Sequence, residues 1–438
     1  MSPHSWKILA GSTLIIVVLV MFAGCTGTPA PQSPNPPGNG ITSPVPTAYS
    51  TTPGTVIAQS NNHFAADLYR EINQENSGPG NNIFFSPFSI SSALALTYEG
   101  AKGTTAGEIR SVFSFPENVS TMRNGFAAVN SGLNERNPGI NLSTANALWA
   151  EKTATFLPEY TGVAEQYYGA NTTSLDFVNQ PDASRQTINS WVAARTNNKI
   201  QNLLPDGSID PSTRLVITNA VYFKGTWEKQ FDANLTVDTP FTKSDGTAVT
   251  AKMMQQTDEN AVFPYAETPD LQMLSLPYSA SGSSNLSMIV LLPRQNDLSA
   301  AGPYLAPSNL SVLEQTSSDR RVDVYIPKFK LETQYSMKKL LSAMGMPTAF
   351  SGAADFSGMD GFHDLYISDV YHKAYIEVNE EGTEAAAATG TVMAGMAAPG
   401  SEPPVPVFRA DHPFLFLIQD NTSGTILFTG RVSDPTSS

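Results

Sequence analysis

The sequence predicts a mixed α/β (α+β) domain over residues 58–438, and three observations support this prediction. The chain has 438 residues, of which 41% are hydrophobic, so it is long and apolar enough to bury a sizeable core. Helical periodicity dominates early in the domain and strand-like runs dominate later. No fixed-period repeat and no second linker interrupts these residues, which favours a single domain.

The expected helices lie near the start of the domain. Ordered structure is expected from about Gln59, where apolar residues recur at every fourth position on one helical face. A second helix is expected from about Pro87. A third is expected to open at Thr105-Ala-Gly-Glu108, which has the spacing of a capping box.

Strand-like apolar runs follow these helices. Several of them are apolar at consecutive positions, which is typical of strands that are covered on both faces. The runs lie at 214–223, 286–292, 321–326, 414–418 and 425–431.

The N-terminal residues resemble a lipoprotein signal. Residues 1–24 contain Lys7 and then an uncharged stretch, 8–24, which is typical of a secretory signal peptide. Cys25, the single cysteine, follows small residues as at a lipoprotein processing site, so we expect it to carry the lipid. An uncleaved signal anchor is the alternative, because seventeen uncharged residues lie at the short edge of what spans a bilayer.

Residues 25–57 are expected to form an extended linker, since they are rich in Pro, Thr, Ser and Gly and carry no charge from residue 26 to residue 56. The expected place of the protein is therefore the outer face of the cell membrane or the extracellular space. With 25 basic against 39 acidic residues, the net charge of −14 disfavours binding to nucleic acid or to an anionic membrane surface. Contact with the membrane is expected through the lipid anchor only.

Motifs of enzymes and cofactor sites are missing from the sequence. The histidines, His4, His63, His363, His372 and His412, have no metal-site spacing, so we expect no metal. Without a nucleophile elbow, a P-loop or a dinucleotide-binding motif, we expect no cofactor and no enzyme. His372 follows a strand-like run and is expected to be a buried structural histidine, with a catalytic role as the alternative.

Residues 380–400 form the most unusual stretch of the chain. A loop of this length inside a compact domain is usually functional, although an exposed low-complexity loop is the alternative interpretation. Its residues alternate so that one face of a hypothetical strand is small and uncharged, which would let the segment enter a sheet without burying a charge. That face holds Thr383, Ala385, Ala387, Thr389, Thr391, Met393 and Gly395.

An ordered series of motifs in this chain resembles the serpin family. It begins with 82–90 and 100–105, continues through 218–228 and 253–256, and then includes 326–330, 354–359 and 370–374. It closes with 411–416 and 426–432. The stretch that is similar to the hinge of an inhibitory member consists of Glu380, Glu381, Gly382, Thr383, Glu384, Ala385, Ala386, Ala387, Ala388 and Thr389.

The resemblance implies a serpin fold of three β-sheets and about eight or nine helices. It also implies that residues 380–407 form an exposed reactive-centre loop that acts as bait for a serine protease. In the family the cut loop inserts as a new strand in the central sheet and traps the acylated protease. Thr383 is thereby expected to be exposed before cleavage and buried afterwards. We expect a monomer.

The resemblance also assigns roles to single residues. Ser86, Ser89, Asn219 and His372 would form the polar cluster beneath the sheet that must part to admit the loop, and Trp227 would lie where insertion begins. Ordinary core packing is the alternative for all five.

The reactive bond is expected between Met396 and Ala397, fourteen residues after the hinge glycine, with the bond after Met393 as a second choice. No Lys or Arg lies between Lys373 and Arg409, so the expected partners are chymotrypsin-, elastase- or subtilisin-like proteases. The alternatives are a non-inhibitory serpin-fold carrier or chaperone, a solute-binding surface lipoprotein and a hydrolase.

Overall fold

The structure, a computed structural model, describes residues 52–75, 81–134, 140–279, 285–383 and 404–437. Several of the residues singled out above lie outside these ranges, namely His4, Lys7, Cys25, Glu384 to Thr389, Thr391, Met393, Gly395, Met396 and Ala397.

Nine α-helices lie within the described ranges, in agreement with the expected number. They are α1 Pro53–Glu75, α2 Pro87–Gly100, α3 Gly103–Phe113, α4 Val119–Asn134, α5 Pro158–Val163, α6 Pro181–Arg195, α7 Pro307–Gln315, α8 Met337–Met344 and α9 Ser357–Asp360. A π-helical turn, η1 Ala164–Tyr168, follows α5, and the 3-10 turns are η2 Ala233–Leu235, η3 Leu298–Ala300, η4 Gly302–Leu305 and η5 Thr348–Phe350. None of the helices in these ranges is long and apolar enough to cross a bilayer.

Two helix starts differ from the expectation. α1 begins at Pro53, before the expected domain boundary at residue 58, because the fixed φ of proline suits a first helical turn and Ile57 already belongs to the core. α3 begins at Gly103, so the expected capping box does not form. The Thr105 hydroxyl instead accepts a hydrogen bond from the backbone N–H of Asp355.

Three β-sheets are present in the described part of the chain, as the family resemblance implies. The six-stranded sheet has the order β12 Phe329–Ser336, β13 Ile367–Asn379, β14 Gly382–Thr383, β4 Leu215–Thr226, β2 Ile140–Glu151 and β3 Asn171–Leu175. The seven-stranded sheet has the order β1 Ile83–Phe85, β17 Thr425–Val432, β16 Phe414–Asp420, β9 Leu286–Pro293, β8 Leu271–Pro277, β7 Val262–Glu267 and β10 Ser318–Arg321. The four-stranded sheet has the order β15 Val407–Arg409, β11 Asp323–Pro327, β6 Ala248–Gln256 and β5 Val237–Thr242.

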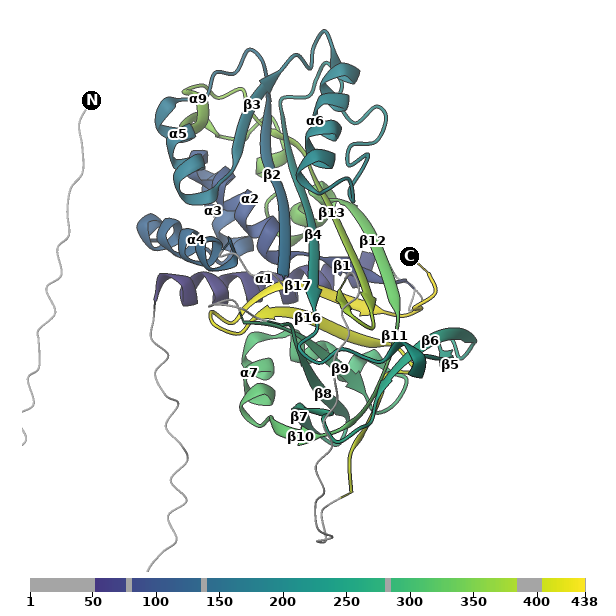
Figure 1. The fold of residues 1–438 in the computed structure, drawn as a ribbon. Helices are drawn as coiled ribbons and strands as arrows, with labels where there is room; N and C mark the ends of the chain where they lie inside the picture. The colour runs from purple at the N-terminus through teal and green to yellow at the C-terminus, as the bar shows by residue number, and fades with distance from the viewer. Residues whose placement is uncertain (1–51, 76–80, 135–139, 280–284, 384–403, 438) are drawn as a thin grey trace, which may run out of the picture. The chain divides into compact units, whose positions relative to one another are not determined.

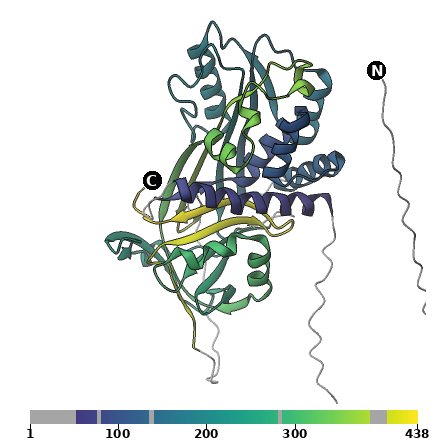
Figure 2. The same ribbon diagram turned by 180° about the vertical axis from the view of Figure 1, so that it is seen from behind.

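The six-stranded sheet is buried on both faces, as the apolar run of β4 predicts. Phe223 and Val221 on one face belong to the main core, which also contains β16, β17 and α1. Tyr222 and Ala220 on the other face pack in a second cluster with Ile188 of α6. Figure 1 shows α6 beside this sheet at its upper end, and Figure 2 shows α1 lying along β17 from behind.

The centre of the sheet holds two strands that separate along their length. β13 and β4 pair in parallel from Ile367 and Leu215 as far as Tyr375 and Tyr222. Beyond this point the two-residue strand β14 lies between them and pairs with both. The sheet is therefore closed over most of its length and open at one end.

Candidate functional site

The site is built where β14 enters between β13 and β4. β14 is antiparallel to both neighbours, with Thr383 opposite Val378 of β13 and Gly225 of β4. Gly382 has a φ of 151°, and a Cβ atom there would lie 2.1 Å from the carbonyl oxygen of Gly225. Only glycine fits this close approach, so Gly382 sets where the chain can turn into the sheet.

Thr383 corrects one expectation from the sequence, because its side chain is fully buried and not exposed. Its hydroxyl lies 2.8 Å from the hydroxyl of Tyr278, a residue that also belongs to the main core. Burial raises the pKa of Tyr278, so this phenol stays protonated and can donate. Thr383, the fourth residue of the hinge, is thus already part of the sheet, and its hydroxyl has a buried partner in Tyr278.

Trp227 lies beside the turn that leads into β14. Its indole N–H donates to the carbonyl oxygen of Asn379 at 3.0 Å, and its backbone N–H donates to the carbonyl oxygen of Glu381 at 2.9 Å. Its ring stacks on Tyr278, with 4.6 Å between the ring centroids. Trp227 therefore holds both the turn before β14 and the tyrosine that binds Thr383.

Glu380 anchors the same turn from outside the sheet. Its carboxylate accepts hydrogen bonds from Lys328 and Thr236, each at 2.7 Å, and its carbonyl oxygen accepts one from the N–H of Phe231. Burial acts to raise the pKa of Glu380, but these donors outweigh it and leave the pKa below its usual value. Spacing in the sequence gave no signal for these partners, because they come from distant strands and turns.

The structure brings the four residues of the expected polar cluster together beneath the closed part of the sheet. The backbone N–H of Ser86 donates to His372 Nε2 at 3.1 Å, and His372 Nδ1 binds Asn219 Oδ1. Asn219 Nδ2 donates to Ser89 Oγ at 2.6 Å. Asn219 also donates to Asn146 of β2 at 2.6 Å, and sequence reasoning missed this fifth member.

His372 joins β13 to β4 as a neutral ring. Complete burial lowers its pKa to about 3. Because the Ser86 N–H donates to Nε2, the ring proton lies on Nδ1 and is donated to Asn219. A second ring proton, on Nε2, would point at the Ser86 N–H. The charged imidazolium of His372 therefore does not fit this hydrogen-bond network. The Ser86 hydroxyl donates to the carbonyl oxygen of Leu427 instead of to His372, which gives no support to a catalytic pair.

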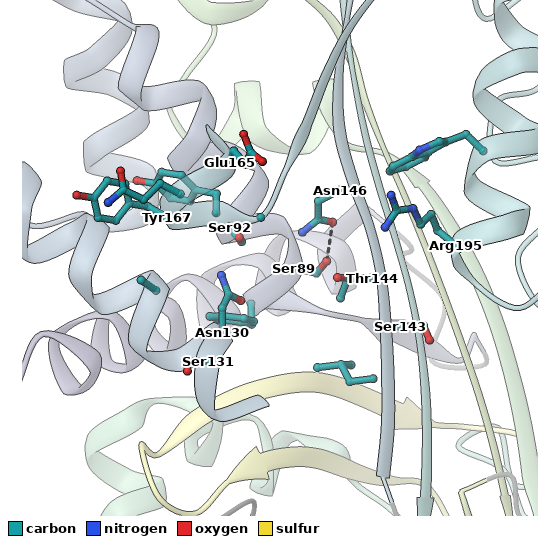
Figure 3. A pocket seen from close by; sticks show the side chains of 17 residues that line it. Ser89, Ser92, Asn130, Ser131, Ser143, Thr144, Asn146, Glu165, Tyr167 and Arg195 are labelled. Atoms are coloured by element: carbon teal, nitrogen blue, oxygen red, sulfur yellow. Dashed lines mark hydrogen bonds between the residues drawn. The ribbon is translucent and has the colours of Figure 1, made fainter. Parts of the chain in front are cut away.

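A cavity borders this cluster on the side of β2. It has a volume of about 510 Å³ and lies between α2, α4 and η1 on one side and β2 and α6 on the other. Figure 3 shows the hydrogen bond between Ser89 and Asn146 at its wall. On this side Asn146 Oδ1 accepts hydrogen bonds from Ser89 and from Asn219.

Comparisons with known proteins agree with this architecture. A family model described as Serpin (serine protease inhibitor) matches residues 59–435. The human leukocyte elastase inhibitor is 40% identical over 394 residues, which cover 86% of this chain and 99% of the inhibitor. An uncharacterized serpin-like protein of Thermococcus kodakarensis is 39% identical over 435 residues, which cover 96% of this chain and 98% of that protein. The solved structure of human thyroxine-binding globulin matches with a TM-score of 0.78 at 29% identity, over 88% of this chain and 100% of that chain.

The fold and the opening in its central sheet define a class of proteins that are in general protease inhibitors and not catalysts. The chain belongs to the serpin family.

We predict that low pH decreases the free energy of unfolding of this protein through protonation of His372. Its pKa is lowered on folding from 6.5 to about 3, so the unfolded chain takes up the proton first as the pH falls. The stability that the neutral ring contributes is complete above pH 6.5 and declines as the pH falls toward 3. Between pH 7 and pH 5 the decline amounts to about 2 kcal/mol.

Urea unfolding of the parent and of His372→Gln at both pH values measures this decline. His372→Gln should have a lower free energy of unfolding than the parent at pH 7. From pH 7 to pH 5, however, its free energy of unfolding should fall by about 2 kcal/mol less than that of the parent. His63→Gln is the control for the loss of a histidine, because His63 is exposed on α1 and lies outside the polar cluster. An equal pH dependence of the parent and His372→Gln would contradict the prediction.

Proposed function

We propose that this protein inhibits serine proteases of the chymotrypsin, elastase or subtilisin type as a suicide substrate. The protease serine attacks the carbonyl carbon of Met396, the bond to the nitrogen of Ala397 breaks, and this nitrogen takes up a proton. The ester that remains joins protease and inhibitor. Insertion of the cut loop then carries the protease along the sheet and distorts its active site before water can hydrolyse the ester.

The observation that carries this proposal is β14, which marks both the entry point and the register of the inserted strand. Continuing the pairing of Thr383 residue by residue places Ala387 opposite Val221 of β4 and Ala374 of β13. Both of these residues are buried in the main core. Small uncharged side chains fit this face, which agrees with the alternation of the loop sequence.

The same register supports Met396 over Met393 as the residue before the cut. Met393 would end opposite Leu215, the first residue of β4, which is fully buried. Met396 would end opposite Ser212, which is exposed, so a bulky protease has room there. Met396 lies thirteen residues after Thr383, and the inserted strand would span about 43 Å between them.

The polar cluster supports the proposal because it is where the strands must part. In the continued register Thr389 lies between Asn219 and His372, on the same face of the sheet. Insertion would break the direct hydrogen bond between His372 and Asn219. The hydroxyl of Thr389 could then accept a hydrogen bond from His372 and donate one to Asn219. The inserted loop would thereby satisfy the buried polar groups that it separates.

A carrier or chaperone of the same fold is the alternative function, and the likeness to human thyroxine-binding globulin belongs to the fold alone. A solute-binding lipoprotein is another. Neither alternative explains why the residues on one alternating face of the loop sequence are all uncharged and, except for Met393, small. The likeness to the human leukocyte elastase inhibitor also favours inhibition.

The proposed function predicts a covalent complex. Incubation of the protein with chymotrypsin, subtilisin or elastase should give a complex that survives boiling in denaturant, because protease and inhibitor are joined by an ester. Mass spectrometry should find a released fragment that starts at Ala397. A fragment that starts at Ala394 would move the cut to Met393, and cleavage without any complex would argue for a carrier.

We predict that Thr389→Val turns much of the protein into a substrate. Valine has the shape of threonine but would leave Asn219 Oδ1 and His372 Nδ1 without a partner after insertion, which costs about 1–3 kcal/mol. If about 1.4 kcal/mol of this appears in the insertion barrier, insertion slows roughly tenfold and hydrolysis competes. The moles of inhibitor consumed per mole of protease silenced should rise.

The matched control is Thr391→Val. In the same register Thr391 falls between Ile217 and Val370, which are both buried and apolar, so loss of its hydroxyl should leave the stoichiometry near that of the parent. Equal stoichiometries for the two variants would show that Thr389 does not reach the cluster, and the register would have to be abandoned.

We also propose that Cys25 carries a lipid that holds the protein at the outer face of the membrane. The support is the position of the single cysteine after the apolar stretch 8–24 and before the linker. In cells, Cys25→Ser should move the protein from the membrane fraction to the soluble fraction, while Thr26→Ser should not. Retention of Cys25→Ser in the membrane fraction would favour the uncleaved signal anchor.

A further inference from the structure

One face of the four-stranded sheet points away from the core and carries a strip of four side chains. Tyr325 of β11 pairs with Arg409 of β15 on one side and with Gln255 of β6 on the other. Gln255 Nε2 donates to the carbonyl oxygen of Leu235, in η2, at 2.5 Å. Phe408 points to the opposite face and is fully buried in the main core. Arg409, Tyr325, Gln255 and Leu235 therefore form a continuous outer strip across the sheet.

Large apolar side chains are exposed along this outer strip. Leu235 itself is 46% exposed, and Val237 and Val407, at its two ends, are each 49% exposed. Val237 lies two residues after Leu235, and Val407 lies two residues before Arg409 on the same face of β15. Exposed apolar side chains that gather in one place are typical of a surface that contacts another protein.

Arg409 adds a positive charge to the outer strip. Its guanidinium lies 3.6 Å from the centre of the Tyr325 ring, and the backbone N–H of Ala410 donates to the carbonyl oxygen of Tyr325 at 2.9 Å. Within the part of the chain that the structure describes, no carboxylate forms an ion pair with Arg409. Stacking holds the guanidinium in one orientation and leaves its N–H groups free to bind a carboxylate of another molecule.

The two ends of the outer strip lie at the two stems of the loop. Beside Leu235, the Thr236 hydroxyl binds the carboxylate of Glu380 at 2.7 Å, three residues before Thr383. At the other end, β15 begins three residues after Pro404, where the described chain resumes. In Figure 1, β5, β6 and β11 lie together at the lower right, below β12 and β13. The loop thus starts at one end of the strip and finishes at the other.

A protease that attacks Met396 is large enough to contact the outer strip. Eight residues separate Met396 from Pro404, so the reacting bond lies at most about 29 Å from this stem. A protease of about 240 residues has a radius of gyration of about 18 Å, so its diameter exceeds this reach. The rim of its cleft can therefore meet the strip while Met396 occupies the cleft.

We propose that the outer strip is a second contact surface for the target protease, and that Arg409 selects enzymes with a carboxylate on the rim of their cleft. This inference rests on the proposed function, because it concerns the same protease before the loop is cut. Arginine and tyrosine are enriched among the side chains that contribute most to protein interfaces. A charge at the rim of an interface acts mainly on the rate of association.

The first experiment measures the second-order rate of inhibition of chymotrypsin, subtilisin and elastase. For the enzyme that the parent inhibits fastest, Arg409→Gln should be about tenfold slower, and Arg409→Lys should keep most of the rate. Raising the salt concentration should narrow the difference between the parent and Arg409→Gln. The stoichiometry of inhibition and the free energy of unfolding should stay those of the parent, which separates loss of contact from a structural defect.

Arg195→Gln is the matched control. Arg195 also lies over an aromatic ring, 5.5 Å from the centre of Trp191, but it is on α6 at the upper end of the molecule in Figure 1. Its loss changes the net charge by the same amount, so the rate of inhibition should match that of the parent. An equal decrease for Arg195→Gln and Arg409→Gln would reflect net charge alone and would overturn the role of Arg409.

The second experiment detects the contact itself. Leu235 is replaced by the photo-crosslinker p-benzoylphenylalanine, and the protein is mixed with a protease whose catalytic serine is changed to alanine. This protease binds the loop without cutting it, so irradiation should join it to position 235. The same crosslinker at Phe362 is the control, because Phe362 is 66% exposed but follows α9 at the upper end of the molecule, and it should give no crosslink.

The outcomes separate this inference from the proposed function. A covalent complex together with unchanged rates for Arg409→Gln and no crosslink from position 235 overturns the inference and leaves the proposed function standing. Cleavage of the loop without any complex overturns the proposed function. In that case the rate of loop cleavage still tests the strip, since slower cleavage of Arg409→Gln supports the contact and cleavage at the rate of the parent overturns it.

Discussion

The pairing of β13 with β4 is the constraint on which the rest of this structure depends. The two strands are parallel neighbours from Ile367 to Tyr375, yet they separate where β14 enters and leave one end of the sheet open. Parallel strands joined through distant segments have no hairpin that forces them to stay adjacent. Their contact can therefore be replaced by a strand that pairs with both, as β14 does at one end.

On the face of the sheet that lines the main core, the side chains of β13 and β4 are apolar except at one point. Both faces are packed with apolar side chains, so an entering segment must bring small uncharged residues if the core is to remain apolar. The exception is the bond between His372 and Asn219, which joins the two strands through buried polar groups. An unsatisfied buried polar group costs about 1–3 kcal/mol. Breaking the bond between His372 and Asn219 therefore costs little only if another polar group takes the place of each lost partner.

The two ends of the sheet have different surfaces. At the entry end, Trp227, Tyr278 and the carboxylate of Glu380 each make hydrogen bonds that hold β14 and the turn before it in place. At the opposite end α9 is packed on α2 and presents Phe362 to solvent. A strand can add to a sheet along a defined path if both ends of the sheet are ordered and the contact between its two central strands, here β13 and β4, can be replaced.

The sequence by itself determined the fold class, the family and the alternation of residues 383–395, because these depend on local patterns and on ordered motifs. It could not determine that Thr383 is already buried, or that Asn146, Lys328 and Tyr278 complete the site. These residues lie far apart in the chain and meet only when strands pair and the sheets pack, which no spacing encodes. The register of β14 is likewise a tertiary fact, since it is set by the close approach of Gly382 to Gly225.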